Sequence, residues 1–168
     1  MRCRGFSLIE LMVTIAVLAV LLAIGLPSFQ GSLRSNRLAT STNELVATMS
    51  LARSEAIRNV RGAAVCPSAD GEVCAAAPDW NEGWIVWRDL DGNSIASADE
   101  VLRYVQPKAQ MRIEGPALID FDSRGRVPAG LATITLEPEE CGGRPMRRIV
   151  QIRVTGQVAR SQELEECE

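Results

Sequence analysis

The sequence predicts an α+β protein in which one long N-terminal helix packs on an antiparallel β-sheet. Three observations predict this class: a charge-free aliphatic run from residue 11 to residue 33, an amphipathic helical pattern after it, and short β-like runs between turn residues beyond residue 62. The chain has 168 residues, which is enough for one globular head. Histidine is absent, and this excludes every imidazole-based catalytic or metal site.

The apolar run is long enough to cross a membrane. A helix rises about 1.5 Å per residue, so about 20 residues span a hydrocarbon core of ~30 Å. The stretch from Phe6 to Leu26 meets that length. Arg2 and Arg4 precede it, which predicts an N-terminus on the cytoplasmic side and a head on the other side of the membrane.

Glu10 is the unexpected residue in this run. An unpaired carboxylate inside a membrane helix costs about 2.5–3.5 kcal/mol, so it needs a partner. The nearest basic side chains, Arg4 and Arg34, lie outside the run. An amino group released by cleavage after Gly5, on this chain or on a neighbour, would serve. A secretory signal peptide cut near residues 23–25 and a plain single-span anchor are the alternatives, and both leave Glu10 unexplained.

The string Gly5-Phe6-Ser7-Leu8-Ile9-Glu10-Leu11, with Pro27 closing the apolar run, resembles the prepilin signature of type IV pilins and type II secretion pseudopilins. The resemblance implies a leader over residues 1–5, cleavage by prepilin peptidase between Gly5 and Phe6, and N-methylation of Phe6. Residues 6–33 would form a transmembrane and assembly helix. Glu10 would pair with the Phe6 amine of an adjacent subunit.

The same resemblance implies a location and a fold. The protein would lie in the bacterial inner membrane with a periplasmic head over residues 34–168, and would then enter a pilus or pseudopilus. The fold would be type IV pilin-like. Pro27 lacks the N–H that an interior helical turn needs, so the sequence predicts a kink or loosened turn there, helped by Gly25 and Gly31.

The second half of the helix is amphipathic, and we expect it over about residues 34–61 with Gly62 as its C-terminal cap. One face carries apolar or small residues at spacings of three and four, which predicts packing against the sheet. These residues are Leu38, Thr42, Leu45, Met49, Ala52 and Ala56.

The β-sheet is expected over about residues 62–168, as one antiparallel sheet of about five to seven strands. Several candidate strands alternate between apolar and polar residues, as half-buried strands do. The candidates are residues 63–66, 83–87, 101–105, 111–113, 118–121, 131–136 and 148–154.

The head also carries motifs in a recognisable order: Ala52-Arg53-Ser54-Glu55-Ala56, then residues 83–86, residues 119–125 and residues 154–156. In this order they resemble the GspH/FimT/FimU group of minor pilins and pseudopilins. The resemblance implies a minor pilin that helps to initiate and assemble a type IV pilus. Its partners would be other minor pilins or pseudopilins, the major pilin and prepilin peptidase. A minor pseudopilin H of a type II secretion system is the alternative.

Four cysteines remain once Cys3 leaves with the leader, and four cysteines allow three pairings. The periplasm is oxidising, so disulfides are expected in the head. Cys66 with Cys74 would close a turn-rich stretch, and Cys141 with Cys167 would fix the charged tail to the sheet. This pairing is the one we favour. The spacings do not suit zinc, and no metal or cofactor is expected.

Two groups of carboxylates were compared with a calcium-binding loop and with a catalytic acid/base pair. Asp89, Asp91, Asn93 and Glu100 have the oxygen spacing of an EF-hand calcium loop, but Ser94 stands where glycine is wanted and a hairpin turn accounts for the same residues. Asp120 and Asp122 flank Phe121 in one strand, which does not make an acid/base pair. The sequence therefore predicts no enzyme and no catalytic residue.

A basic stretch near the C-terminus suggests a second alternative function, that of a DNA-binding minor pilin for DNA uptake. Some relatives are associated with a Gly-Arg-x-Arg motif there, whereas this chain reads Gly156-Gln157-Val158-Ala159 before Arg160. Loss of the leader would leave 16 basic against 21 acidic side chains, so any DNA contact needs a local basic patch. The candidate contacts are Arg144, Arg147, Arg148, Arg153 and Arg160.

Overall fold

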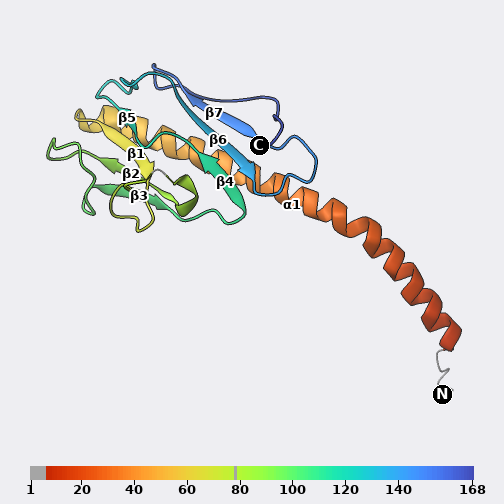
Figure 1. Ribbon diagram of the computed structural model, residues 1–168. Helices are drawn as coiled ribbons and strands as arrows, with labels where there is room; N and C mark the ends of the chain where they lie inside the picture. The colour runs from red at the N-terminus through yellow and green to blue at the C-terminus, as the bar shows by residue number, and fades with distance from the viewer. Residues whose placement is uncertain (1–6, 78) are drawn as a thin grey trace. The chain divides into compact units, whose positions relative to one another are not determined.

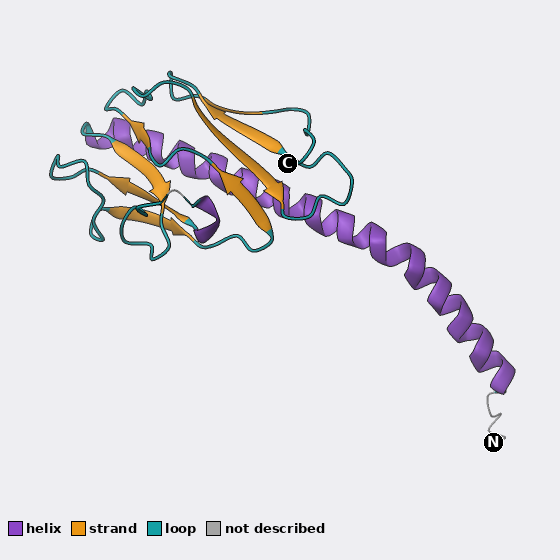
Figure 2. Ribbon diagram, viewed as in Figure 1, coloured by secondary structure: helices purple, strands orange, loops and turns teal. Residues whose placement is uncertain are grey.

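The computed structural model describes residues 7–77 and 79–168, apart from the side chain of Pro27. The described residues form one long helix, a short 3-10 helix over Trp80–Glu82 and two antiparallel sheets (Figure 2). It divides into two compact units, residues 1–36 and residues 37–168, and each is described by itself. The predicted cleavage and methylation at Gly5 and Phe6 lie outside the described residues.

Helix α1 runs from Leu8 to Asn59. The helix assignment is continuous through Pro27, where the sequence predicts a kink or loosened turn. Tolerance of an interior proline is known in membrane helices, where neighbouring groups compensate for the missing backbone hydrogen bond. The helix also ends two residues before the predicted end. Asn59 stops it, because its side-chain oxygen accepts hydrogen bonds from the backbone N–H groups of Arg61 and Gly62 at 2.9 and 3.1 Å.

The strands form two four-stranded antiparallel sheets, not the single sheet that the sequence predicts (Figure 1). The first sheet has the order β3-β2-β1-β5 and the second has the order β4-β6-β7-β8. The seven predicted strands are all present within two residues of their expected ends, and β8 was not predicted. The bounds are β1 Ala63–Pro67, β2 Trp84–Arg88, β3 Val101–Val105, β4 Met111–Glu114, β5 Ile119–Phe121, β6 Ala132–Pro138, β7 Arg148–Ile152 and β8 Val158–Arg160.

The core lies between both sheets and residues 38–56 of α1. The predicted helix face is confirmed, since Leu45, Met49, Ala52 and Ala56 are fully buried. They pack with inward residues of both sheets, and the small alanines let the strands approach the helix closely. Trp84 of β2 fixes one such contact, because its Nε1 donates a hydrogen bond of 3.2 Å to Oγ1 of the buried Thr48.

The outer face of the first sheet is also apolar. A second buried cluster lies there, formed by Ala64 and Cys66 of β1, Ile85 and Trp87 of β2, and Ala96. Ala96 comes from the loop that joins β2 to β3, and Cys74, which is bonded to Cys66, packs against the cluster together with Val101 and Tyr104 of β3. The loops on this face therefore belong to the packed structure of the head.

Candidate functional site

The first half of α1 presents apolar side chains to its surroundings in every direction. Residues from Leu8 to Leu26 include thirteen large hydrophobic side chains that are each about half exposed or more. An 18-residue window of this helix has a mean hydropathy of 2.7, with none of it buried in the structure. A surface of this kind is stable only against lipid or other apolar helices.

Glu10 is exposed in the first turn of this helix. Its backbone N–H lies 3.3 Å from the hydroxyl of Ser7, which acts as a weak cap. Within residues 7–36, the described part of its unit, no basic side chain is paired with its carboxylate. The nearby hydroxyl of Thr14 is satisfied by the carbonyl of Leu11 at 2.8 Å. A cationic partner for Glu10 would therefore have to come from outside the described part of this helix half.

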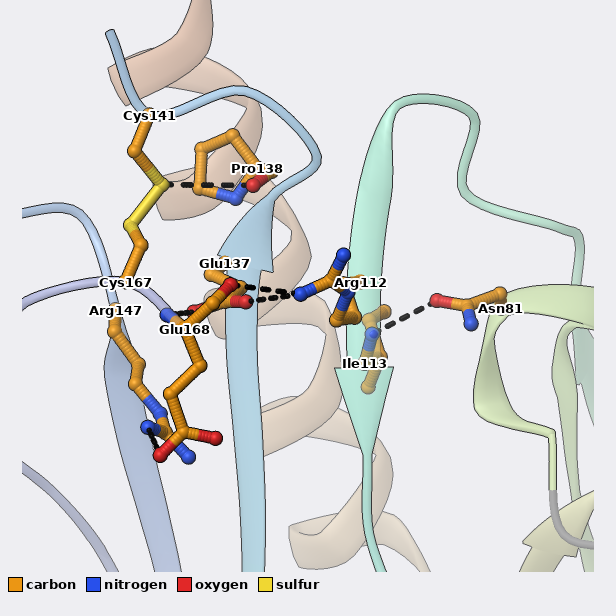
Figure 3. A network of polar contacts seen from close by, with 9 residues as sticks. All are labelled: Asn81, Arg112, Ile113, Glu137, Pro138, Cys141, Arg147, Cys167 and Glu168. Carbon is orange, nitrogen blue, oxygen red and sulfur yellow. Dashed lines mark hydrogen bonds and ion pairs between the residues drawn. A yellow bond between two sulfur atoms is a disulfide. The ribbon is translucent and has the colours of Figure 1, made fainter. Parts of the chain in front are cut away.

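Two disulfides close loops of the head. Cys66 is bonded to Cys74 and Cys141 to Cys167, which is the pairing that the sequence favours. The first bond secures the loop after β1 against the outer face of the first sheet. The second brings the C-terminal residues beside β6 and β7 (Figure 3).

A network of charged groups holds the C-terminal residue in place beside that second disulfide (Figure 3). The buried carboxylate of Glu137 accepts hydrogen bonds from Arg112 at 3.1 Å and from the backbone N–H of Glu168 at 3.2 Å. Arg112 also donates to the backbone carbonyl of Glu168 at 2.8 Å. The side chain of Glu168 pairs with Arg147 at 2.6 Å and raises the pKa of that guanidinium.

The candidate DNA contacts do not converge on one surface. Arg147 is engaged by Glu168, and Arg148 donates to the carbonyl of Ser161 at 2.7 Å. Arg160 lies opposite the buried Val150, so it shares the helix-facing side of the second sheet, and it donates to Asn43 of α1 at 3.1 Å.

Arg153 follows the last residue of β7 and is exposed, and its guanidinium donates to the side-chain oxygen of Gln157 at 3.3 Å. Arg144 lies in the exposed loop before β7. Arg147 and Arg148 thus contact the C-terminal segment, Arg160 contacts α1, and Arg144 and Arg153 are exposed at separate positions. This distribution does not form the continuous basic patch that phosphate binding requires.

The candidate calcium loop does bring its acids together. Carboxylate oxygens of Asp89, Asp91 and Glu100 all lie within 4.8 Å of one another. Most of these oxygens already accept local hydrogen bonds, however. Asp89 accepts from the backbone of Gly92 at 2.8 Å, and the buried Glu100 accepts from the backbone of Leu90 at 2.7 Å and from Ser97 at 2.8 Å. The contacts are those of a well-ordered turn, as the alternative reading of the sequence expects.

Three separated sequence motifs of the head meet at one point. Gly125 packs directly on Arg53 and Ile57 of α1, since a Cβ on Gly125 would lie 2.7–3.0 Å from their side chains. Gly156 crosses Gly125 so closely that a Cβ there would lie 1.9 Å from its carbonyl oxygen. Both glycines are buried and have positive φ angles of 70° and 74°. The motifs thus share one packing point between the helix and two turns.

Asp122 belongs to the turn that contains Gly125, Asp120 lies two residues earlier in β5, and the two acids have opposite electrostatic environments. The carboxylate of Asp122 accepts 2.9 Å hydrogen bonds from the backbone N–H groups of Arg126 and Arg124, and these lower its pKa. Desolvation by the surrounding protein, together with the charges of Asp122 and Asp89, raises the pKa of Asp120. The sequence showed both acids but gave no sign of this difference.

The first half of α1 is apolar and exposed and has one carboxylate near its start, and the second half lies in the core of a head with two sheets. This combination defines a pilin-like assembly protein. The family described as type II transport protein GspH matches residues 41–156, and the prokaryotic N-terminal methylation motif matches residues 1–26. The chain belongs to the GspH family and is a minor pilin or pseudopilin of the GspH/FimU type.

Individual relatives agree with this assignment. The type IV minor pilin FimU of Pseudomonas aeruginosa (strain PAO1) is 23% identical, with a TM-score of 0.56 over 78% of this chain and 90% of that one. The minor pseudopilin EpsH from the type 2 secretion system of Vibrio cholerae is 13% identical, with a TM-score of 0.52 over 74% of this chain and 96% of that one. These likenesses establish the fold.

The N-terminal segment has its own relative. The prepilin peptidase-dependent protein D of Escherichia coli (strain K12) is 61% identical over 31 residues, which are 18% of this chain and only 21% of that protein. The shared segment is therefore confined to the length of a prepilin signature and its apolar helix. The family and the neighbouring structures are structural pilins, not enzymes.

Proposed function

We propose that this protein is a minor pilin that helps to initiate and assemble a type IV pilus. Prepilin peptidase cleaves it between Gly5 and Phe6, the new N-terminus of Phe6 is methylated, and α1 holds the protein in the inner membrane with its head in the periplasm. Assembly then transfers the apolar half of α1 from lipid to a bundle formed with other minor pilins and the major pilin. No new apolar surface has to be exposed in that transfer.

The observation that carries the proposal is the exposed carboxylate of Glu10, which has no cationic partner within the described part of its unit. In an apolar environment the charge is stable only when it is paired. The amine of Phe6 on an adjacent processed subunit supplies the opposite charge at the same depth. The pair would form only after cleavage, which couples processing to assembly.

A type IV pilus is favoured over a type II secretion system by the fold comparison, in which FimU has the higher TM-score and identity of the two kinds of neighbour. The alternative is a minor pseudopilin of a secretion system, and it uses the same Glu10 chemistry. Deletion of the gene distinguishes them: loss of surface pili with normal secretion supports the pilus, and the reverse result supports the pseudopilus. DNA uptake is less favoured because the basic residues are dispersed.

The assembly step can be tested with Glu10→Gln, which keeps the shape of the side chain and removes its charge. We expect its content in sheared filaments to fall at least about tenfold, the effect of losing an ion pair of ~1.4 kcal/mol or more. Its amount in the membrane fraction should stay normal. Thr14→Val, one helical turn further on, is the matched control and should assemble normally.

Two results would contradict the proposal. One is a mature protein whose mass still includes residues 1–5. The other is incorporation of Glu10→Gln at the native level, measured by quantitative immunoblot against the major pilin.

A further inference from the structure

Three large apolar side chains are exposed at the end of the head where α1 stops. Ile57 of α1 is 49% exposed, Leu131 before β6 is 59% exposed, and Val154 after β7 is 43% exposed. They come from three separate segments, so the fold, and not one apolar stretch of sequence, brings them to this end. Apolar side chains that gather on the surface of a soluble domain mark a contact site for a protein partner.

Contacts between the segments hold these side chains on one surface. Gly125 packs against Ile57, since a Cβ on the glycine would lie 2.7 Å from Cδ1 of the isoleucine. Val127, in the same connection, donates its backbone N–H to the carbonyl of Val154 at 3.0 Å. Leu131 directly precedes β6, and the first residue of β6 pairs with the last residue of β7. The end of α1, the connection from β5 to β6 and the turn after β7 therefore lie side by side.

The same three segments carry four arginines. Arg124 and Arg126 are exposed in the connection after β5, and Arg153 is exposed directly before Val154. Arg53 lies on α1, one helical turn before Ile57. These apolar and basic residues together are named the arginine patch: Arg53, Ile57, Arg124, Arg126, Leu131, Arg153 and Val154.

Arg53 is the member of the patch that the fold holds in place. Its stem passes Gly125 and its Nε passes Gly156, since Cβ atoms on the two glycines would lie 3.0 Å from Cγ and 2.9 Å from Nε. The Nε is buried and has no hydrogen-bond partner among the described residues. A guanidinium is always charged and binds carboxylates through a planar set of donors. Arg53 is therefore positioned in advance, without an acid of its own.

The positive charge of the patch is not balanced within the described head. None of its four arginines forms an ion pair there. Arg153 donates instead to the neutral side chain of Gln157 at 3.3 Å. Asp122 is the acid beside the patch, and it accepts backbone N–H groups of its own turn. Glu55, the nearest acid on α1, is paired with Arg58. The patch thus presents a surplus of positive charge among exposed apolar side chains.

We propose that the arginine patch binds an acidic surface of a different, adjacent subunit, with a carboxylate of the partner on Arg53 and its apolar side chains over Ile57, Leu131 and Val154. Arginine and carboxylate form paired, charge-assisted hydrogen bonds, and arginines beside apolar side chains are typical of the energetic centre of protein interfaces. The inference rests on the proposed function in taking the partner from the same assembly.

The composition of the patch favours a protein partner over nucleic acid. A phosphate backbone would leave the three apolar side chains without a complementary contact, and it would meet the negative charge of Asp122. A partner with carboxylates among apolar residues matches both parts of the patch. Because the chain is a minor subunit, its neighbour is a different subunit and not a second copy.

The contact can be tested in cells with a photo-crosslinking residue in place of Leu131 of the full chain. We expect a product that joins this chain to a different pilin subunit, through a segment that contains aspartate or glutamate. Arg53→Met keeps the stem beside Gly125 and removes the guanidinium. It should reduce the yield of the product at least about tenfold, as expected when one partner of an interfacial charge pair is lost.

A melting temperature separates binding from a structural role of Arg53. Arg53→Met should melt within a few degrees of the native chain in detergent, since it removes a buried donor that has no acceptor. If this variant does not fold, Arg126→Gln, an exposed change, should still lower the yield about threefold. Arg144→Gln is the matched control, because Arg144 is exposed in the loop before β7, and its yield should be normal.

Several results would overturn the proposal. They are a product formed with a second copy of the chain, a crosslinked segment without an acid, and a yield unchanged by both Arg53→Met and Arg126→Gln. Retardation of a short DNA duplex by the native chain, lost in these two variants, would assign the patch to phosphate instead and would also overturn it.

The proposed function is judged separately, by the native protein in sheared filaments. Incorporation of the native protein without the Leu131 product would refute the arginine patch alone. Formation of the product without incorporation would refute the proposed function alone.

Discussion

At the scale of single residues, two aspartates that are two positions apart, one in β5 and one in the following turn, have pKa values shifted in opposite directions. Asp120 is surrounded by negative charge and has a raised pKa, so the folded state binds its proton more tightly than the unfolded state does. Its ionisation lowers the free energy of unfolding as the pH rises from the ordinary value of 3.8 through the raised value. Asp122 has a lowered pKa, so its contribution is present above 3.8 and is lost as the pH falls through the lowered value.

Asp120→Asn should therefore raise the melting temperature at pH 7, and Asp122→Asn should lower it. Both differences should vanish at a pH below the lowered pKa of Asp122, where both native carboxyl groups are protonated. Thermal unfolding followed by circular dichroism from pH 2.5 to pH 7 measures the effect. Asp122→Ala is a control that removes the hydrogen-bond acceptor itself and should destabilise at every pH. The same sign for both Asn variants at pH 7 would contradict this account.

Some residue-level features could be predicted from the sequence and others could not. The buried stripe of Leu45, Met49 and Ala52 follows from helical spacing alone, and the favoured disulfides follow from loop content and compartment. The environment of Asp120 could not be foreseen, because it depends on the register that places Ala64 beside it and on a loop 30 residues earlier in the chain.

At the scale of elements, the strands were predictable but their division into two sheets was not. Alternation identifies where β4 and β6 lie, yet it does not say that these strands pair while β5, which lies between them in sequence, pairs with β1. Strand β8 was not predicted because it has only three residues, none of them fully buried, and lies at the edge of its sheet. The end of α1 was misplaced because Asn59, and not Gly62, provides the cap.

The two disulfides should differ in what they contribute to stability. They join cysteines 8 and 26 residues apart, and the entropy removed from the unfolded chain grows with the length of the closed loop. Replacing Cys66 and Cys74 by serine should cost about 2.5 kcal/mol, and replacing Cys141 and Cys167 about 3.5 kcal/mol. Denaturant unfolding of both double variants checks the order. A larger loss from the shorter loop would show that packing of the outer-face cluster, and not loop closure, dominates.

At the scale of the whole molecule, the chain combines an apolar unit with a head that has its own closed core. Residues 37–168 contain both sheets, both disulfides and the complete core cluster. Among the residues that the structure describes, none from 7 to 36 belongs to that cluster. The sequence predicts a boundary between residues 33 and 34, because the pattern changes there from uniformly apolar to amphipathic along a single helix.

A variant without residues 1–36 should therefore be monomeric in aqueous buffer, with a melting temperature within a few degrees of the full chain. The full chain should need detergent to stay dispersed, since its apolar helix is exposed. Size-exclusion chromatography with light scattering, together with calorimetry, measures both properties. Aggregation or loss of cooperative unfolding in the shortened variant would show that the first 36 residues support the head after all.

The first half of α1 has one more consequence, which concerns orientation about its own axis. A helix that is apolar on all sides has no preferred rotation about its own axis among neighbouring helices. Glu10 is the charged residue among residues 8–27 that breaks this symmetry. Moving the carboxylate by one position would turn it by about 100° around the helix. If Glu10 pairs with a neighbouring Phe6 amine as proposed, this one side chain would set the rotational angle between adjacent subunits.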